Sequence, residues 1–251
     1  MPTIAGLYRY PVKGLSAEAL TEVALATGET FPNDRAFAIE NGRSKFDPAE
    51  PRWLPKASFL MLMKNERLAA LATRFDDATA TLTIRQAGAV VAEGRLDTEA
   101  GRRSIEAFFA SYAAKELRGP AKVLSAPRHS FSDVAGKVVS LINLESLHDL
   151  GKHAGAAIHP LRFRANLYVA GLSAWDETRW IGREIAAGSL RLRGVKPIDR
   201  CAATNVSPET AVRDLTIPET LTSAYGKPDC GIYLEVVSAG EMKIGDAIGP
   251  A

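Results

Sequence analysis

Cys201, one of only two cysteines in the chain of 251 residues, has the sequence neighbours of a reactive or metal-binding thiol. Arg200 precedes it, and a stretch rich in hydroxyl, amide and proline groups follows it, from Ala202 to Pro208. A neighbouring cation favours the thiolate, which is the form that binds soft metals or attacks electrophiles. A free cysteine is also among the most frequently buried residue types, so an inert core position is the alternative interpretation.

Basic side chains placed after predicted strand ends or turns could form a pocket for an anion. Lys13 follows Tyr-Pro-Val, Arg35 follows Asn-Asp, and Arg164 and Arg200 lie in the second half of the chain. Arginine offers two parallel donors to a phosphate, and lysine offers a point charge. Gly14, directly after Lys13, would let backbone amides approach an anion closely. Each cation alone is more typical of a solvated surface, so the pocket requires these segments to converge in the fold.

Several common catalytic motifs are missing from the sequence. The four histidines, His129, His148, His153 and His159, do not have the spacing of a zinc site. No G-x-S-x-G elbow, Walker A loop or G-x-G-x-x-G fingerprint occurs. Two cysteines supply neither a disulfide framework nor the four thiolates of a ferredoxin-type iron–sulfur cluster. The remaining candidate is Cys201, acting either as a soft metal ligand or as a nucleophile.

The composition is that of an ordinary globular protein. With 46% hydrophobic residues, the chain can build one large domain or two modest ones. A net charge of +2 and the absence of Lys/Arg runs argue against a nucleic-acid surface. The first residues lack a signal-peptide pattern, and no apolar run reaches membrane-spanning length. We therefore expect a soluble cytoplasmic protein that acts on a small-molecule substrate, with no nucleic-acid and no membrane partner.

The first half of the chain is predicted to form mainly strands. Residues 79–85 alternate between polar and apolar side chains, and Gly88 then predicts a hairpin. The apolar run Ser58–Lys64 is consistent with a buried strand that uses its two methionines as core filler. A helix follows, with an apolar stripe formed by Ile105, Phe108, Phe109 and Tyr112. The segment that begins at Ala126 is the candidate domain boundary.

The second half begins with another apolar run, residues 138–142, which Asn143 follows. Asparagine is a favoured N-cap, and the leucines at 144, 147 and 150 share one face of the predicted helix. Further strands are expected at residues 166–170, 189–195 and 232–237. The sequence therefore predicts a β-rich α+β chain with a few short helices, closer to a barrel than to alternating βαβ units.

The order of these motifs resembles that of MOSC-domain proteins, in particular the amidoxime-reducing molybdenum enzymes and their bacterial counterparts. The segments that carry the resemblance are Tyr10–Lys13, Asp34–Arg35, Arg162–Asn166, Trp175–Glu177, Arg200–Val206, Tyr225–Tyr233 and Ile244–Asp246. The resemblance implies a MOSC-type β-barrel with a few short helices at residues 126–251. It also implies a smaller, β-barrel-like N-terminal domain at residues 1–125.

The resemblance further implies roles for single residues. Cys201 matches the cysteine that ligates molybdenum in the family's reductases and carries sulfur in its sulfurases. Asp229 could pass a proton to a substrate or simply cap a turn. Cys230 could be a second thiol that lines the site or a small buried residue that enters a strand. Many relatives have serine where this chain has Gly14. The residues that the resemblance places near the pterin cofactor or its phosphate are Lys13, Gly14, Arg35, Ser140, Asn143, Arg164, Asn166, Arg200 and Thr204.

The function implied by the resemblance is that of a molybdenum-dependent oxidoreductase. It would bind the molybdopterin form of the molybdenum cofactor, with Cys201 as metal ligand, and reduce N-hydroxylated compounds. Electrons would come from a separate electron-transfer protein, because this chain has no iron–sulfur motif. The pyridoxal-phosphate domain of the eukaryotic sulfurases is also missing, so we do not expect that cofactor. Two alternatives stay open: a sulfur carrier that holds a persulfide on Cys201, and a cofactor-binding module without turnover.

Overall fold

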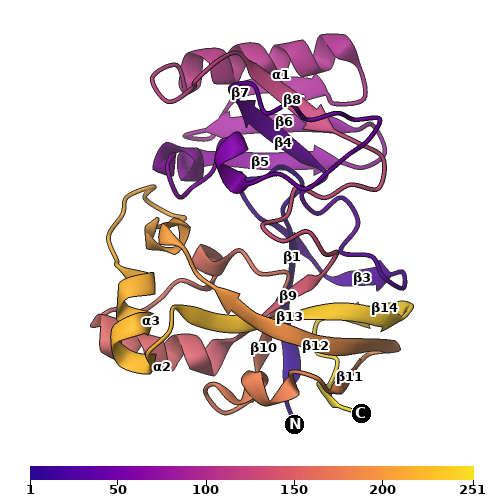
Figure 1. Ribbon diagram of the computed structural model, residues 1–251, viewed down its shortest axis with the longest axis vertical. Coiled ribbons are helices and arrows are strands. Elements are labelled where there is room, and N and C mark those ends of the chain that lie inside the picture. The colour runs from indigo at the N-terminus through magenta and orange to yellow at the C-terminus, as the bar shows by residue number, and fades with distance from the viewer.

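The computed structural model describes all 251 residues, which form two stacked halves rich in strands (Figure 1). The strands are β1 (Thr3–Arg9), β2 (Glu18–Leu20), β3 (Glu22–Leu25), β4 (Phe37–Asn41), β5 (Leu71–Asp76), β6 (Thr81–Gln86), β7 (Ala89–Arg95), β8 (Ala121–Ser125), β9 (Val139–Asn143), β10 (Leu167–Ala170), β11 (Glu184–Ala187), β12 (Leu190–Asp199), β13 (Asp229–Ser238), β14 (Gly240–Lys243) and β15 (Ile248–Pro250). The helices are α1 (Glu99–Tyr112), α2 (Leu144–Ala154) and α3 (Ile217–Tyr225), with short 3-10 helices η1 (Lys56–Ser58), η2 (Glu66–Ala70), η3 (Pro160–Phe163), η4 (Asp176–Trp180) and η5 (Ala202–Asn205). The predicted β-rich α+β class with a few short helices is confirmed.

Eight strands of the lower half in Figure 1 form one mixed sheet, in the order β15-β11-β12-β13-β9-β10-β1-β2. Neighbouring strands pair antiparallel except β9 and β10, which are parallel. The end strands β15 and β2 do not pair with each other, so the sheet is not a closed barrel. Side chains such as Leu141, Leu192 and Leu234 are fully buried in its core, and hydrophobic burial of this kind is the main favourable term in folding.

The first strand of the chain lies within this lower sheet. β1 pairs with β10 through Leu7 and Leu167, while β3 pairs with β14 close to the C-terminus. Because β1 and β10 are antiparallel, the residues that follow β1 lie beside the residues that precede β10. This pairing brings Lys13 toward Arg164, although 151 positions separate them in the sequence. The division of the chain between residues 125 and 126 stays a prediction, and the two halves share strands.

The upper half packs α1 against two small sheets, β5-β6-β7 and β4-β8. From the predicted apolar stripe, Ile105 and Phe109 are fully buried. Thr98 caps the helix by accepting a hydrogen bond from the Gly101 amide, a typical N-cap contact. A Cβ added at Gly101 would lie only 2.1 Å from the Arg95 oxygen, so glycine lets the helix start against β7.

Helix α2 begins where the sequence predicted. The Asn143 side chain accepts a hydrogen bond from the Glu145 amide at 3.1 Å, and Leu147 and Leu150 are buried. Gly155 ends the helix in the left-handed conformation that favours glycine. Helices α2 and α3 contact each other in the lower half of the molecule (Figure 1). None of the three helices has the length and hydropathy needed to cross a membrane.

The prediction of a strand at Ser58–Lys64 is wrong, because these residues enter a turn after η1. The Asn65 side chain accepts a hydrogen bond from the Met61 amide at 2.9 Å. The amides of Lys64 and Asn65 in turn donate to the Met61 oxygen at 3.0 and 2.9 Å. An asparagine side chain offers the backbone such local bonds in place of a strand ladder. The turn places Met61 and Met63 at the wall of a pocket.

Candidate cofactor pocket

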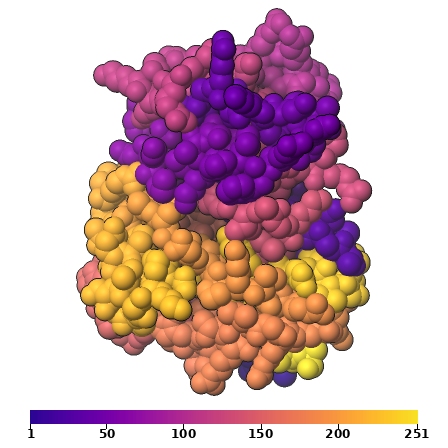
Figure 2. All heavy atoms as spheres, viewed as in Figure 1, coloured from indigo at the N-terminus to yellow at the C-terminus, as the bar shows by residue number.

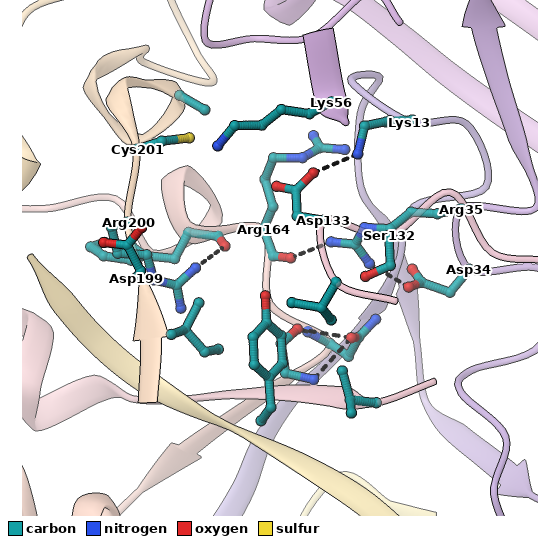
Figure 3. Close-up of a pocket in the computed structure, with 18 of the residues that line it drawn as sticks. Lys13, Asp34, Arg35, Lys56, Ser132, Asp133, Arg164, Asp199, Arg200 and Cys201 are labelled. Atoms are coloured by element: carbon teal, nitrogen blue, oxygen red, sulfur yellow. Dashed lines mark hydrogen bonds and ion pairs between the residues drawn. The ribbon is translucent and has the colours of Figure 1, made fainter. Parts of the chain in front are cut away.

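A pocket of about 340 Å³ is lined by residues from both halves of the chain. In Figure 2 residues of the first half lie above those of the second, and Figure 3 shows side chains of the pocket. Small-molecule and cofactor sites commonly have volumes of about 300–1,000 Å³. Nine residues predicted from the sequence line the pocket: Lys13, Gly14, Arg35, Ser140, Arg164, Asn166, Arg200, Cys201 and Thr204.

Lys13 is a buried cation in the segment that follows β1. Its ammonium donates to the Phe131 oxygen at 2.8 Å and to Asp133 Oδ1 at 2.5 Å. Burial lowers the pKa of Lys13, while Asp133 acts in the opposite direction. Gly14 has a φ of +83°, and an added Cβ would lie 3.0 Å from the Leu60 oxygen. Glycine is therefore the residue that this position accommodates without strain.

Arg35 and Arg164 both lie over the ring of Tyr10, with guanidinium carbons 4.8 and 4.3 Å from its centroid. Arg35 forms an ion pair with buried Asp34 and donates to the Arg164 backbone oxygen at 2.8 Å. Arg164 donates Nη1 to the Leu15 oxygen at 2.6 Å. Burial raises the pKa of Tyr10 to about 12, so a neutral ring lies beneath the two cations. Burial lowers the pKa of Arg164 to about 10.

Arg200 and Cys201 lie where the chain leaves β12. Arg200 donates Nε to the Cys230 oxygen at 2.8 Å and Nη1 to the Phe163 oxygen at 3.0 Å, which fixes its guanidinium. Cys201 directly precedes η5, and the Thr204 hydroxyl donates to its backbone oxygen at 3.0 Å. The Cys201 side chain is half-buried and faces the pocket in Figure 3. Backbone anchors on both sides thus present the thiol at a fixed place.

Three nitrogens of arginines that line the pocket are buried without a hydrogen-bond partner: Nε of Arg162, Nη2 of Arg164 and Nη2 of Arg200. An unsatisfied buried donor costs about 1–3 kcal/mol, and native proteins keep few of them. Arg162 already pairs with Asp214, whereas Arg164 and Arg200 have no ion-pair partner, and an anion would satisfy their Nη2 donors because arginine pairs well with phosphate oxygens. The thiol of Cys201 in the same pocket suits a soft metal. The donor set therefore fits a ligand with a phosphate group and a thiophilic metal.

Ser140 and Asn166 line the pocket and bond to each other. The Ser140 hydroxyl donates to Asn166 Oδ1 at 2.8 Å and accepts from the Asn166 amide at 3.0 Å. Asn166 Nδ2 donates to the Tyr8 oxygen at 3.2 Å. These bonds tie β9, β1 and the start of β10 together. These bonds hold the ends of the three strands, and Arg164 beside them, in place.

Asn143 and Asp229 do not line this pocket. Asn143 is fully buried, because its side chain caps α2 and donates Nδ2 to Glu177 Oε2 at 3.0 Å. Asp229 is the first residue of β13, where it pairs with Asp199. Its neighbour Cys230 is buried, and burial raises the pKa of that thiol to about 12. The structure thus brings together nine of the predicted residues and leaves Asn143 and Asp229 apart.

The contact between Asn143 and Glu177 predicts a pH-dependent stability. Glu177 is fully buried and also accepts from the Ser146 hydroxyl at 2.9 Å, and burial raises its pKa above the ordinary 4.5. Between pH 4.5 and the higher pKa of Glu177 in the folded protein, the folded chain binds more protons than the unfolded chain. The free energy of unfolding should therefore fall as pH rises through this window and then level off. Glu177→Gln should remove the slope. Urea unfolding at a series of pH values checks this, and an unchanged slope in the glutamine variant would contradict it.

Glu177→Ala serves as the comparison variant. It should lower the free energy of unfolding by about 2 kcal/mol, because the buried donors of Asn143 and Ser146 lose their acceptor.

Lys56 and Asp133 also line the pocket and were not predicted from the sequence. Lys56 begins η1, whereas Asp133 lies in the loop between β8 and β9. Asp133 belongs to no helix or strand and Lys56 only to a three-residue 3-10 helix, so a proline before Lys56 and a serine before Asp133 were the only local signals. Asp199 lines the pocket from β12 and Tyr233 from β13. Both strands were predicted from their apolar residues, and these two side chains were not assigned to a site.

Comparison with protein families identifies the class of the protein. Residues 126–249 match the MOSC domain, and residues 1–118 match the MOSC N-terminal beta barrel domain. The chain therefore belongs to the MOSC-domain proteins and carries the N-terminal domain as well, which confirms the resemblance seen in its motifs. Lys13, Arg35 and Lys56 lie in the first matched region, and Arg164 and Cys201 lie in the second. The pocket is thus built by both.

Curated relatives extend the comparison. Mitochondrial amidoxime reducing component 2 of Bos taurus is 31% identical over 122 residues, which is 44% of this chain and 36% of that protein. Mitochondrial amidoxime-reducing component 1 of Mus musculus is 29% identical over 131 residues, 47% of this chain and 37% of that protein. Molybdenum cofactor sulfurase of Homo sapiens is 22% identical over 267 residues, 92% of this chain and 30% of that protein. The chain thus spans about a third of the length of these relatives.

Solved structures give a weaker likeness. The YUAD protein of Bacillus subtilis has a TM-score of 0.44 and 15% identity, over 99% of this chain and 94% of that one. YiiM of Geobacillus stearothermophilus has a TM-score of 0.36 and 18% identity, over 45% of this chain and 53% of that one. Membership of the family rests on the two matched domains.

Proposed function

We propose that this protein is a molybdenum-cofactor-binding oxidoreductase that reduces N-hydroxylated compounds with electrons from a separate redox protein. One observation carries the proposal. The Cys201 thiol shares a pocket with two arginines whose buried Nη2 donors have no protein partner. Support for the reaction class comes from relatives whose names describe amidoxime reduction.

The residues present fit the molybdenum cofactor. Cys201 would ligate the molybdenum, because thiolates are preferred ligands of soft metals. Arg164 and Arg200 would donate their free Nη2 groups to anionic oxygens of the cofactor, including its phosphate. Lys13 and Arg35 would add positive charge to the same wall of the pocket. The half-buried thiol leaves room beside it for a substrate.

The proposed reaction breaks an N–O bond, consumes two electrons and two protons, and releases water. When bound, the cofactor supplies a metal centre that accepts oxygen and exchanges electrons in pairs. The chain's own residues would bind the cofactor and hold it in place, with Cys201 as the ligand of its metal. Electrons would come from a partner, because the two cysteines of this chain are too few for an iron–sulfur cluster.

Turnover with an artificial electron donor tests this function. Protein from a host that makes molybdenum cofactor would be mixed with reduced viologen and an aryl amidoxime, and the amidine product would be measured. We expect turnover from the loaded protein and none from protein made in a cofactor-deficient host. Failure of fully loaded protein to reduce any N-hydroxylated compound would reject the reductase.

A second candidate function, sulfur transfer, is favoured by the match to a molybdenum cofactor sulfurase over 92% of the chain. In that role Cys201 would hold a persulfide and pass its outer sulfur to an acceptor. Mass spectrometry of the Cys201 peptide separates the candidates after incubation with a low-molecular-weight persulfide, which transfers its outer sulfur to the thiolate and leaves as a thiol. A persulfide on Cys201 in protein that takes up no molybdenum would favour the carrier.

A further inference from the structure

The pocket carries more positive charge than its ion pairs neutralise. Eight Lys and Arg and three Asp side chains line it, an excess of five positive charges, although the net charge of the whole chain is +2. Four of these cations form ion pairs with carboxylates: Lys13, Arg35, Lys137 and Arg162. Four others have no carboxylate within 4.0 Å: Lys56, Arg164, Lys196 and Arg200.

Lys56 is an unpaired cation that lies apart from Arg164 in Figure 3. In Figure 3 its side chain extends from η1 across the pocket toward the sulfur of Cys201. Lys13, Arg164 and Asp133 form a separate group in the same view. Lys56 is half-buried, so its ammonium is held at the pocket yet remains within reach of a ligand.

No carboxylate forms an ion pair with Lys56. Asp133 pairs with Lys13, and Asp199 lines the pocket without an ion pair. The group that Lys56 faces is the sulfur of Cys201 (Figure 3). A cation without a carboxylate partner therefore lies beside the thiol.

We propose that Lys56 forms an anion subsite beside Cys201 and that the protein acts on N-hydroxylated compounds that carry a negative group, a carboxylate or a phosphate. The substrate class rests on the proposed function, whereas the subsite itself does not. The free donors of Arg164 and Arg200 suit the cofactor's own anionic oxygens, which leaves the charge of Lys56 for a second anion. A focused positive field next to the reacting centre raises the local concentration of an anionic substrate.

Alkylation of Cys201 tests the subsite without assuming any reaction. The Cys201 thiolate attacks iodoacetate and iodoacetamide alike and displaces iodide from each, but only iodoacetate is negatively charged. The ratio of the two alkylation rates therefore reports the local charge and is independent of the amount of thiolate. Full-length, cofactor-free protein is used, and mass spectrometry separates the Cys201 peptide from Cys230. Lys56→Met should lower the ratio about fivefold, the effect of one unit charge at contact distance in water. Lys56→Arg should keep the ratio.

Lys115, an exposed residue just after α1, provides the matched control. Lys115→Met should leave the alkylation ratio unchanged. An unchanged ratio in both Lys56→Met and Lys56→Glu would overturn the proposal. A wild-type ratio no higher than that of a neutral cysteine peptide would overturn it as well.

Steady-state kinetics then identify the anion. Neutral, carboxylate-bearing and phosphate-bearing versions of one aryl amidoxime are compared in the loaded protein. In Lys56→Met, the KM of at least one anionic version should rise about fivefold, while that of the neutral version should not. Equal rises for all three would overturn the role in substrate binding. If loaded protein reduces none of them while the alkylation ratio still depends on Lys56, the reductase fails and the anion subsite stands.

Discussion

Cys201→Ala is expected to abolish reduction of N-hydroxylated compounds, lowering turnover by more than about a hundredfold. Even residues that only support a metal ligand typically cost 10–100-fold when they are changed, so loss of the ligand itself should cost more. The fold should survive, because Cys201 is half-buried and its backbone, not its sulfur, makes the observed bond to Thr204. Turnover with reduced viologen, divided by protein concentration, gives the measurement.

Cys230→Ala is the matched control for this variant. Cys230 is the other free thiol of the chain, and it is buried in the lower half without lining the pocket. It should keep turnover per bound molybdenum close to that of the wild type. Full turnover in Cys201→Ala, or equal losses in the two variants, would contradict the role assigned to Cys201.

Arg164→Met is expected to stabilise the cofactor-free protein while weakening its hold on the cofactor. Arg164 is a cation with no ion-pair partner and one buried donor left unbonded, and burial lowers its pKa to about 10. Since that folded pKa lies below the unfolded value of 12.5, keeping the side chain charged at neutral pH costs stability. Replacing this charge by an apolar side chain of similar volume should therefore raise the free energy of unfolding of the cofactor-free protein.

Arg164→Met should also bind less cofactor, because the substitution removes a hydrogen-bond donor to the cofactor's phosphate. We expect at least about tenfold less pterin per chain after gel filtration. Urea unfolding of cofactor-free protein and fluorescence of the oxidised pterin measure the two effects. A destabilised variant that keeps its cofactor would contradict the account of Arg164.

Arg35→Met supplies the contrast for the same substitution. Arg35 is paired with Asp34, whose carboxylate also accepts from the Tyr10 amide at 2.8 Å. Removing Arg35 leaves Asp34 as an uncompensated buried charge, which typically costs about 3–5 kcal/mol. The two methionine variants should therefore change the free energy of unfolding in opposite directions.

Local sequence signals predicted the elements well where one residue dominates the local hydrogen bonding. Asn143 and the leucines behind it fixed the start of α2 before any tertiary contact was known. The strand prediction for Ser58–Lys64 was wrong because a single residue dominates the local hydrogen bonding there too. The Asn65 side chain accepts a hydrogen bond from the Met61 amide and turns a stretch whose apolar residues had indicated a strand.

The pocket could be predicted only in part. Arg164 and Cys201 lie in recognisable motifs, and the antiparallel pairing of β1 with β10 explains why Lys13 joins them. Lys56 enters from the short η1 and Asp133 from the loop between β8 and β9, and no periodicity in the sequence marks either residue. The family resemblance placed Asn143 near the cofactor, whereas its side chain caps α2 and donates to Glu177.

The central claim is that this pocket binds molybdenum cofactor through Cys201, and the amounts of metal and pterin per chain test it most directly. Wild type and Cys201→Ala would be purified from a host able to make the cofactor, with molybdenum counted by plasma mass spectrometry and pterin by fluorescence. We predict close to one molybdenum and one pterin per chain in the wild type, and loss of the metal in Cys201→Ala. Wild-type protein that carries neither, from a host that loads another molybdenum enzyme in the same culture, would contradict the claim.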